Sequence, residues 1–516
     1  MIKTVSPWLK VLTFFIMIFA TWMAIRYAHQ LPLDLYAFRQ GQTALTAYWI
    51  VQNGFSFAYE TPVGGAPWSI PFEFPIYQYL VVIIYELFGT SLEAAGRLTS
   101  FAFLLGCLYP AKVIVRKLEL SPNVFFVFAC LLLSSPLYLY WGRMFMIETT
   151  ALFFALSSIP LFLDFYQKHI KWQWPSVFFF MLFSTLAMLQ KSTTGFPVLT
   201  ILGILWLFNQ IKYTQKIIHI ITARNIFLVL LAFVMPVLIG MLWVYYTDLL
   251  KAQNTLGTHL TSTELSTWNW GTLEQRFSPS VFKEIVWRRL VKENAGNTLG
   301  FFLFAYVLFS AHLPKLKKLI FLCMVFYALP IALFTNLHII HPYYQAACLL
   351  FALAGLAIII GEWIPEVSKK LFLIPLITVL FMGLNLYRFY QNYLPIMRIQ
   401  HNIVQDRELR IAKIIQKAIP PTHGFIAYGF DWSSVLAYLA QRKSFTVPHF
   451  IKKFQGNKPW ENPQDYFGNT PLSAIVVCFT GTEEPTLEQV NLRFKSDKIW
   501  RMETTDGCRI LIRKQL

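Results

Sequence analysis

The stretch WLKVLTFFIMIFATWMAIRY, residues 8–27, carries charge only near its ends, at Lys10 and Arg26. About 20 apolar residues in a helix span the roughly 30 Å hydrocarbon core of a bilayer. The stretch is long for a signal peptide and lacks a small-residue cleavage site, and further apolar stretches follow it. It therefore predicts a retained first transmembrane helix.

The composition of the whole chain also favours a membrane protein. Apolar residues make up 56% of the 516 residues and charged residues 14%, whereas soluble proteins carry about 25% charged residues. The net charge of +18 would suit nucleic-acid binding, but many basic residues cluster in short gaps between apolar stretches. This is the positive-inside pattern of cytoplasmic loops, so we predict no nucleic-acid partner. The basic clusters are Lys3 and Lys10; Lys112, Arg116 and Lys117; Lys168 and Lys171; Lys212, Lys216 and Arg224; Lys315, Lys317 and Lys318; and Lys369 and Lys370.

These clusters limit the number of membrane crossings. An even number of crossings must separate the first cluster from the second, yet three apolar stretches lie between them, 8–27, 72–88 and 94–115. The second stretch is short and contains Pro75 and two glutamates, so we expect it in the outer interface or re-entering from that side. The same reasoning predicts eleven crossings, with a cytoplasmic amino terminus and an outer carboxyl terminus. The remaining crossings are expected at 122–141, 149–166, 173–190, 194–211, 226–247, 298–312, 319–337, 343–361 and 371–389.

The chain divides into two predicted domains. Residues 1–390 form a transmembrane domain with outer loops at 28–92 and 248–297, and residues 391–516 form a periplasmic α/β domain. The fold class is therefore an all-α polytopic membrane protein with a small C-terminal α/β extramembrane domain. In that domain we expect helices at 403–418 and 433–441, strands at 425–428, 444–447 and 474–479, then a final helix and a hairpin ending at 508–512.

The six cysteines carry little predicted chemistry. Two of them, Cys478 and Cys508, fall in the outer domain, where a disulfide between them is one of two open alternatives. The other four lie in apolar stretches and are expected to be small core residues: Cys107, Cys130, Cys323 and Cys348.

Polar residues gather in the predicted outer segments, at the depth of lipid headgroups. A carboxylate there could take a proton from an acceptor hydroxyl or amine, and cations could stabilise a lipid-phosphate leaving group. Arg143 and Glu148 could equally mark the point where a helix leaves the bilayer. The candidate catalytic carboxylates are Asp34, Glu73 and Glu148, and the candidate phosphate-binding cations are Arg39, Arg143 and Lys191.

Other side chains near these could bind substrate. The candidates are Gln40, Gln42, His341, Tyr343 and Tyr344. His338 and His341 could hold a metal, but two histidines three residues apart are a weak signal, so we predict no cofactor and leave a divalent metal open. No Walker loop, GxGxxG or HExxH motif stands in a credible context, which argues against an ATP-driven transporter and a zinc protease.

Four segments resemble motifs of a known family. Residues 73–98 (EFPIYQYL…YELFG…AGRL) look like its first-loop signature, and 38–44 (FRQGQTA) look like an Arg-Gln-x-x-Thr-Ala motif of a subset. Residues 142–148 resemble its second outer-loop acidic motif, and 341–345 (HPYYQ) its late His-x-Tyr-Tyr motif. On these motifs the sequence resembles the GT-C glycosyltransferases, specifically the glycosyltransferase family 39-like and RgtA/B/C/D-like proteins related to the dolichyl-phosphate-mannose-protein mannosyltransferases. The resemblance is best over 1–210.

The resemblance implies the GT-C fold and an inverting glycosyltransferase of the inner membrane. Such an enzyme moves a sugar from a polyprenyl-phosphate donor to a lipid, polysaccharide or protein acceptor at the outer face. The chain departs from the family at three places. Arg39-Gln40 stands where many members carry Asp-Glu, Gln42 replaces the acidic residue that the subset has before Thr43, and Phe74 stands where relatives carry a phosphate-binding Lys. The identity of the base therefore stays open among the three carboxylates.

Two other function classes compete with the enzyme hypothesis. One is a transporter or flippase of lipid-linked sugars, and the other is a scaffold that binds such lipids without catalysis. Transporters often contain inverted repeats with broken helices at mid-membrane. The sequence shows no such repeat, and its polar residues gather at one face, which favours the enzyme.

Overall fold

The computed structural model of the protein describes residues 5–167, 174–214, 223–401, 406–448, 459–478 and 499–514. Four lysines of the predicted basic clusters lie outside these residues: Lys3, Lys168, Lys171 and Lys216. The final helix expected between the strand at 474–479 and the closing hairpin lies outside them too.

The chain forms two compact units, each assembled from segments that are distant in sequence. The helical unit consists of residues 1–28, 97–243 and 266–397. The second, which we call the mixed unit, consists of residues 29–96, 244–265 and 398–516. The first outer loop and part of the second thus belong with the C-terminal segment. The domain boundary at residue 391 stays a prediction.

Long apolar helices dominate the helical unit. Within the described residues, eight helices are long and apolar enough to cross a membrane: Pro7–Arg26, Leu92–Lys117, Glu148–Tyr166, Ser192–Lys212, Asn225–Lys251, Pro314–Leu333, Leu349–Ser368 and Leu373–Asn392. Three shorter apolar helices coincide with the other predicted crossings: Pro122–Ser134, Trp174–Gln190 and Thr298–Phe309. The prediction of a multi-pass helical membrane protein with a small C-terminal sheet is confirmed, whereas the count of eleven crossings stays a prediction.

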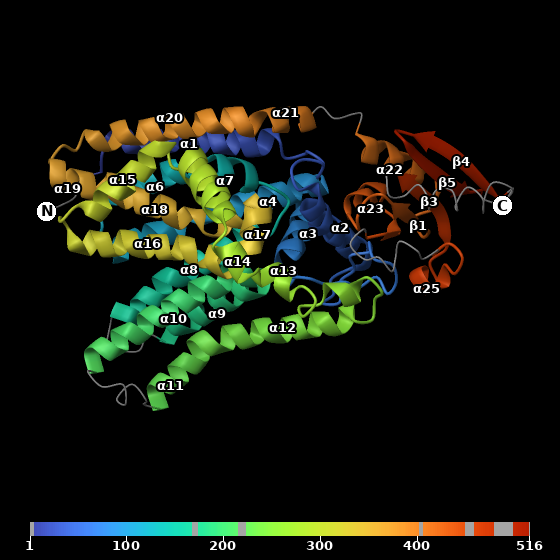
Figure 1. Cartoon of the computed structure of the whole chain (residues 1–516), viewed down its shortest axis with the longest axis horizontal. Helices are drawn as coiled ribbons and strands as arrows, with labels where there is room; N and C mark the ends of the chain where they lie inside the picture. Colours follow the sequence, from blue (N-terminus) through green and yellow to red (C-terminus); the bar gives the residue numbers. More distant parts are fainter. Residues whose placement is uncertain are drawn as a thin grey trace. The chain divides into compact units, whose positions relative to one another are not determined.

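The helices of this unit pack around a buried centre. Helix α6 packs against α1 and α18, and α18 packs against α16, as their neighbouring ribbons show in Figure 1. The helices with their bounds are α1 (Pro7–Arg26), α4 (Leu92–Gly106), α5 (Leu108–Lys117), α6 (Pro122–Ser134), α7 (Pro136–Trp141), α8 (Glu148–Gln167), α9 (Trp174–Gln190), α10 (Ser192–Thr214), α11 (Ala223–Val229), α12 (Met235–Lys251), α13 (Ser266–Trp270), α14 (Leu273–Arg276), η4 (Val281–Asn294), α15 (Thr298–Phe309), α16 (Pro314–Leu333), α17 (Thr335–Ile340), η5 (Pro342–Ala347), α18 (Leu349–Ile358), η6 (Ile359–Trp363), α19 (Ile364–Ser368), α20 (Leu373–Asn392) and α21 (Leu394–His401).

The crossing expected at 122–141 is broken into two helices, α6 and α7. Pro136 has no N–H, and the residue before a proline is pushed out of the helical conformation, so Ser135 is extended. The buried Asn294 side chain satisfies this break. Its amide oxygen accepts hydrogen bonds from the Ser135 hydroxyl at 2.6 Å and the Leu137 N–H at 3.1 Å.

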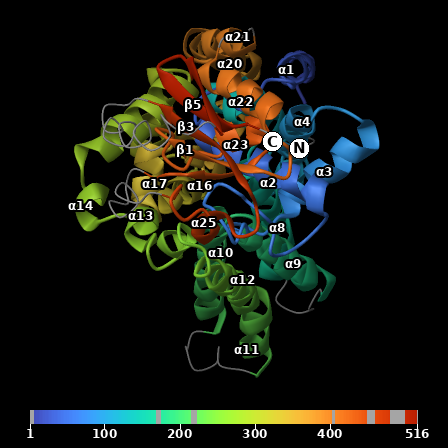
Figure 2. The same cartoon turned by 90° about the vertical axis from the view of Figure 1, so that its right-hand side faces the viewer.

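A five-stranded sheet forms the core of the mixed unit, with the order β2-β1-β3-β5-β4. Strand β1 is parallel to β2 and β3, and β5 is antiparallel to β3 and β4. Figure 2 shows α22 and α23 beside the sheet. The strands are β1 (Gly424–Tyr428), β2 (Lys443–Thr446), β3 (Leu472–Cys478), β4 (Trp500–Thr505) and β5 (Cys508–Arg513), and the helices are α2 (Ala37–Asn53), α3 (Ile76–Phe88), α22 (Arg407–Ala418), α23 (Val435–Ala440) and α25 (Gln464–Phe467).

Each of the expected strands of this domain is present. Cys478 and Cys508 face each other in the β3–β5 ladder, and they form a disulfide. The bond closes a loop of 30 residues. Of the two alternatives that the sequence left open, the disulfide is the one found.

The first outer loop covers the β2 edge of the sheet. The N–H groups of Ser444 and Thr446 in β2 donate to the carbonyls of Pro62 and Val63, at 3.0 and 2.9 Å. Gly65 returns a bond from its N–H to the Ser444 carbonyl at 3.2 Å. An unpaired strand edge is a site of aggregation, so this loop protects the β2 edge.

Helix α2 lies close against α23 in the same unit. A Cβ placed on Gly41 would lie 2.8 Å from the Val435 side chain and 3.1 Å from its backbone. No larger residue fits there without movement of one helix. The glycine of the FRQGQTA stretch therefore sets the distance between α2 and the C-terminal segment.

The predicted topology can be tested with reporter fusions. We expect fusions after Lys117 and Lys318 to report the cytoplasm, because these residues lie in basic turns. Fusions after Glu60 and at the carboxyl terminus should report the outside. The measurement is the ratio of a periplasm-active to a cytoplasm-active reporter. A cytoplasmic carboxyl terminus would contradict the eleven-crossing topology.

Candidate functional site

A buried ion pair links two turns of the helical unit. Glu148 is the first residue of α8, where the positive end of the helix dipole stabilises a carboxylate. Lys191 lies between the end of α9 and the start of α10. Its Nζ donates to Glu148 Oε1 at 2.5 Å, and the two side chains are 5% and 3% exposed. Each charge compensates for the burial of the other.

The backbone holds Lys191 in place. Its N–H donates to the Ala187 carbonyl at 2.9 Å, and its own carbonyl accepts from Thr194 and Gly195 at 2.9 and 3.0 Å. A Cβ on Gly195 would lie 2.8 Å from the Met188 nitrogen. The turn between α9 and α10 is therefore tight enough to require glycine, and this fixes the lysine opposite Glu148.

Two tyrosines of the HPYYQ segment contact the lysine. Lys191 Nζ lies 3.9 Å from the ring centroid of Tyr344 and 5.4 Å from that of Tyr343. A cation above a desolvated aromatic face gains about 2 kcal/mol. Pro342 opens the short 3-10 helix η5 that carries both rings. The predicted substrate residues of η5 and the predicted cation Lys191 therefore lie together.

The two histidines pack against the same rings. His341 is stacked on Tyr343 and Tyr344, with centroids 5.2 and 5.9 Å apart, and the His338 ring lies 5.9 Å from Tyr344. Burial, with Arg289 and Lys191 nearby, lowers the pKa of His338 to about 3, so its imidazole is neutral. Among the described residues, no three His, Cys, Asp or Glu side chains are grouped to hold a metal.

Arg143 is buried close to this cluster. It donates to the Tyr27 carbonyl at the end of α1, at 3.4 Å, and its guanidinium lies 5.6 and 5.8 Å from the rings of Tyr27 and Tyr140. The ring of Trp141, the residue after Tyr140, lies 5.8 Å from that of Tyr343. An aromatic layer thus connects the Arg143 turn with the lysine pair. The contacts of Arg143 suit a residue that positions this turn.

Several polar atoms in the cluster are buried without a partner among the described residues. They include Glu148 Oε2, His338 Nδ1 and both amide atoms of Gln345. An unsatisfied buried polar group costs about 1–3 kcal/mol, so native proteins rarely keep several together. Such a group is typical of a site that receives a polar ligand. Gln345 belongs to the quoted HPYYQ motif, but sequence reasoning did not select it as a site residue.

A second cluster of candidates lies in the mixed unit. Arg39, near the start of α2, pairs with Glu73 and donates to Gln42 Oε1 at 2.5 Å. Glu73 keeps a quarter of its side chain exposed. Gln40 Nε2 donates to Asp34 Oδ1 at 2.6 Å, and both side chains are buried. All five candidates of the first outer loop therefore form two neighbouring hydrogen-bonded groups.

Sequence reasoning missed one cation of this second cluster. Lys251 is the last residue of α12, is buried, and lies 5.2 Å from the ring centroid of Phe72. Its Nζ is 3.5 Å from Asp248, and it also interacts electrostatically with Glu73. Glu73 thus interacts with two cations, Arg39 and Lys251. The only local signal in the sequence is a lysine at the end of a long apolar stretch, and a lysine there is equally typical of a residue that anchors a helix end at the headgroups.

Solved structures with this arrangement of helices are known. No protein-family model matches the chain, and no curated protein matches it in sequence. The crystal structure of ArnT from Cupriavidus metallidurans bound to undecaprenyl phosphate is similar over 97% of both chains, with a TM-score of 0.59 and 13% identity. The chain has the GT-C fold.

Two further GT-C structures support this. The archaeal oligosaccharyltransferase AglB from Archaeoglobus fulgidus, in complex with an inhibitory peptide and a dolichol-phosphate, matches 99% of this chain and 75% of its own, with a TM-score of 0.53 and 11% identity. The arabinofuranosyltransferase AftD from Mycobacteria matches 100% of this chain and 40% of its own, with a TM-score of 0.55 and 10% identity. The GT-C fold expected from the sequence motifs is confirmed, while the roles of the candidate residues stay predictions.

The buried pair should be important for stability. We expect Lys191→Met to lower the free energy of unfolding by about 3–5 kcal/mol, because it leaves Glu148 charged and alone. The double variant Glu148→Gln/Lys191→Met should recover part of this loss. The measurement is thermal unfolding in detergent. As a control, Lys369→Met removes a surface ion pair with Glu366 and should change stability by less than about 1 kcal/mol. Equal losses of stability in Lys191→Met and Lys369→Met would contradict the assignment of the Glu148–Lys191 pair as a stabilising buried ion pair.

Proposed function

We propose that the protein is a membrane glycosyltransferase that moves a sugar from a polyprenyl-phosphate donor to a lipid, polysaccharide or protein acceptor at the outer face of the membrane. The observation that carries this proposal is the Glu148–Lys191 pair. It is a buried carboxylate, with one oxygen that has no partner among the described residues, beside a buried cation and an aromatic layer. Support comes from the GT-C fold, found here over nearly the full length of ArnT, which was solved with undecaprenyl phosphate.

The proposed reaction needs a base and a stabilised leaving group. The acceptor oxygen or nitrogen attacks the anomeric carbon of the sugar, and its proton passes to a carboxylate. The bond between the anomeric carbon and the phosphate oxygen breaks, and its electron pair stays on the polyprenyl phosphate. Attack opposite the leaving group inverts the anomeric configuration. Glu148 is the proposed base because one of its oxygens accepts from Lys191 and the other has no partner among the described residues.

Asp34 and Glu73 are assigned supporting roles in the proposal. Asp34 is occupied by the Gln40 amide and fixes the start of α2. Glu73 pairs with Arg39, so it orients the guanidinium until the donor phosphate competes for it. If Glu148 is not the base, Glu73 is the next candidate, because its side chain is partly exposed.

The donor phosphate requires cations, since an unpaired anion cannot be buried at low cost. Phe74 takes the place of the lysine that relatives carry, and its ring packs on Phe57. We assign phosphate binding to cations of each unit taken separately. In the mixed unit these are Arg39 and Lys251, which interact with Glu73, and in the helical unit it is Lys191. Arg143 positions the turn before Glu148.

Transfer activity tests the proposal. Purified protein should transfer or hydrolyse the sugar of at least one polyprenyl-phosphate donor in a panel, and Glu148→Gln should lower turnover by roughly 10²-fold or more. Glu366→Gln, at a half-exposed carboxylate in α19, serves as the control and should keep the wild-type rate. Donor binding without turnover, for every donor, would favour the scaffold hypothesis, and lipid transfer across vesicles would favour the flippase.

Donor affinity tests the phosphate assignment. We expect Arg39→Ala to weaken binding of the donor lipid about tenfold or more, and Arg39→Lys to restore only part of it, because lysine lacks the two-pronged donor geometry of arginine. Affinity and melting temperature should be measured on the same samples. Arg288→Lys, which alters a surface pair with Glu284 at 2.7 Å, is the matched control. A lower melting temperature with unchanged donor affinity would mean that Arg39 has only a structural role.

A further inference from the structure

A groove lies between α5 and α6 on the surface of the helical unit. One face of α5 lines it, since residues three and four apart lie on the same side of a helix. The cavity has a volume of about 600 Å³, and Tyr109, which lines it, is 74% exposed. The residues that matter here are Tyr109, Lys112, Val113 and Arg116 of α5 and Phe125 and Phe126 of α6.

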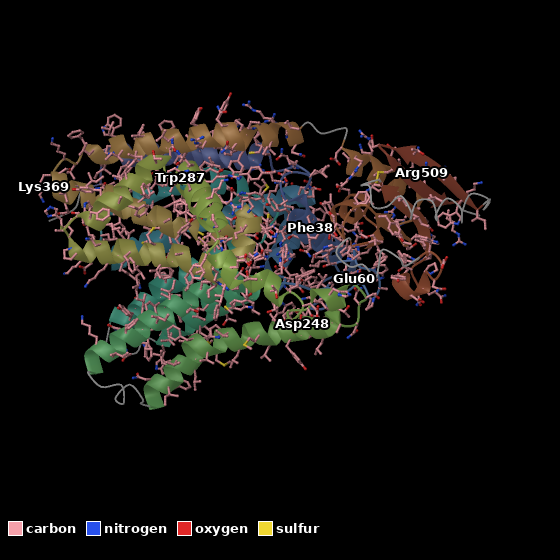
Figure 3. All side chains as sticks on the ribbon, viewed as in Figure 1. Phe38, Glu60, Asp248, Trp287, Lys369 and Arg509 are labelled. Atoms are coloured by element: carbon pink, nitrogen blue, oxygen red, sulfur yellow. A yellow bond between two sulfur atoms is a disulfide. The ribbon has the colours of Figure 1, made fainter. Side chains whose placement is uncertain are left out.

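This groove and the candidate site lie at opposite ends of α1. The N–H of Ser6, just before α1, donates to Asn123 at the start of α6, at 3.0 Å. Arg143 instead contacts Tyr27, directly after α1. The 20 residues of α1 span about 30 Å, the thickness of the hydrocarbon core. Lys369, labelled in Figure 3, lies at the same end of the helical unit as the start of α1.

The wall of the groove is positively charged. Neither the Lys112 nor the Arg116 side chain forms an ion pair or hydrogen bond with a residue that the structure describes, and both are exposed. Their neighbour Lys117 is paired with Asp164. Glu119 is the one carboxylate among the described residues that line the cavity, so two cations face a single anion and a net positive charge remains.

Charge and apolar surface are arranged as a phospholipid requires. Arg116 is next to the last residue of α5, and Tyr109 lies seven residues earlier, about 10 Å along the helix. The cations therefore stand at the depth of headgroups, and Tyr109 and Phe126 lie along the path of an acyl chain. Basic residues at this depth attract anionic lipids. A zwitterionic headgroup would bring a cation of its own next to Lys112, so an anionic headgroup fits this position better.

We propose that the groove between α5 and α6 binds an anionic phospholipid of the leaflet at the amino end of α1, with its phosphate at Lys112 and Arg116 and an acyl chain against Tyr109 and the α6 phenylalanines. This lipid is distinct from the polyprenyl-phosphate donor. It occupies the end of the helical unit remote from Glu148 and Lys191.

Lipid binding to the full-length protein tests this. The protein is placed in nanodiscs of phosphatidylcholine, and phosphatidylglycerol with the same acyl chains is titrated in and followed by native mass spectrometry. We expect selective retention of phosphatidylglycerol by the wild type. The double variant Lys112→Gln/Arg116→Gln should weaken it roughly tenfold. Val113→Trp fills the groove without changing charge, and it should weaken binding as well.

The control removes two other exposed lysines from a basic turn. Lys315 and Lys318 of α16 make no side-chain ion pair or hydrogen bond with described residues, and Lys315→Gln/Lys318→Gln should change phosphatidylglycerol binding less than twofold. Equal losses in the two double variants would mean general surface attraction and would overturn the proposal. Unchanged binding in Val113→Trp would do so too. Preference of this groove for undecaprenyl phosphate over phosphatidylglycerol would also overturn it.

Discussion

Burial of the Glu148–Lys191 pair constrains much of the helical unit. A lone carboxylate or ammonium in this position would cost several kcal/mol, so the two turns that carry them must meet with correct geometry. One turn requires the glycine at 195, where a Cβ would collide with the preceding helix. The other is held by Arg143, which binds the end of α1. Both side chains of the pair are buried, and the Tyr343 and Tyr344 rings lie beside Lys191, so the attraction acts in a medium of low dielectric.

Closure of the sheet is the corresponding constraint in the mixed unit. Strand β2 would be a free edge without the segment at 62–65, which pairs with it. Asn254 then fixes that segment, because its amide donates to the carbonyls of Gly65 and Pro67 at 2.7 and 3.0 Å. The first outer loop, which contains residues 62–65, continues to Glu73. The second outer loop, which contains Asn254, also contains Lys251. The contacts that complete the sheet therefore also set the spacing of the proposed phosphate-binding cations.

The sequence predicted those features that depend on local pattern. Apolar length located the membrane helices, and the expected strands of the C-terminal segment were found. The motif residues of each unit were found in contact with one another. Features that depend on distant partners were missed. Nothing local indicates that Asn294 satisfies the break before Pro136, or that residues 62–65 pair with β2. Lys251 was missed for a similar reason, because a lysine at the end of an apolar helix ordinarily reaches for headgroups, and only its neighbours Phe72 and Glu73 distinguish it.

Cations at the two ends of the helical unit can be separated by what surrounds them. Lys191 is buried, paired with Glu148 and close to the Tyr344 ring. Its charge therefore lies in a medium of low dielectric, where it would act strongly on the proposed phosphate. Lys112 and Arg116 are exposed, so salt and water screen them, and they suit a lipid that exchanges with its leaflet. A net charge of +18 therefore need not serve one partner. Under the two proposals, the buried cation serves the donor lipid and the exposed cations serve a phospholipid.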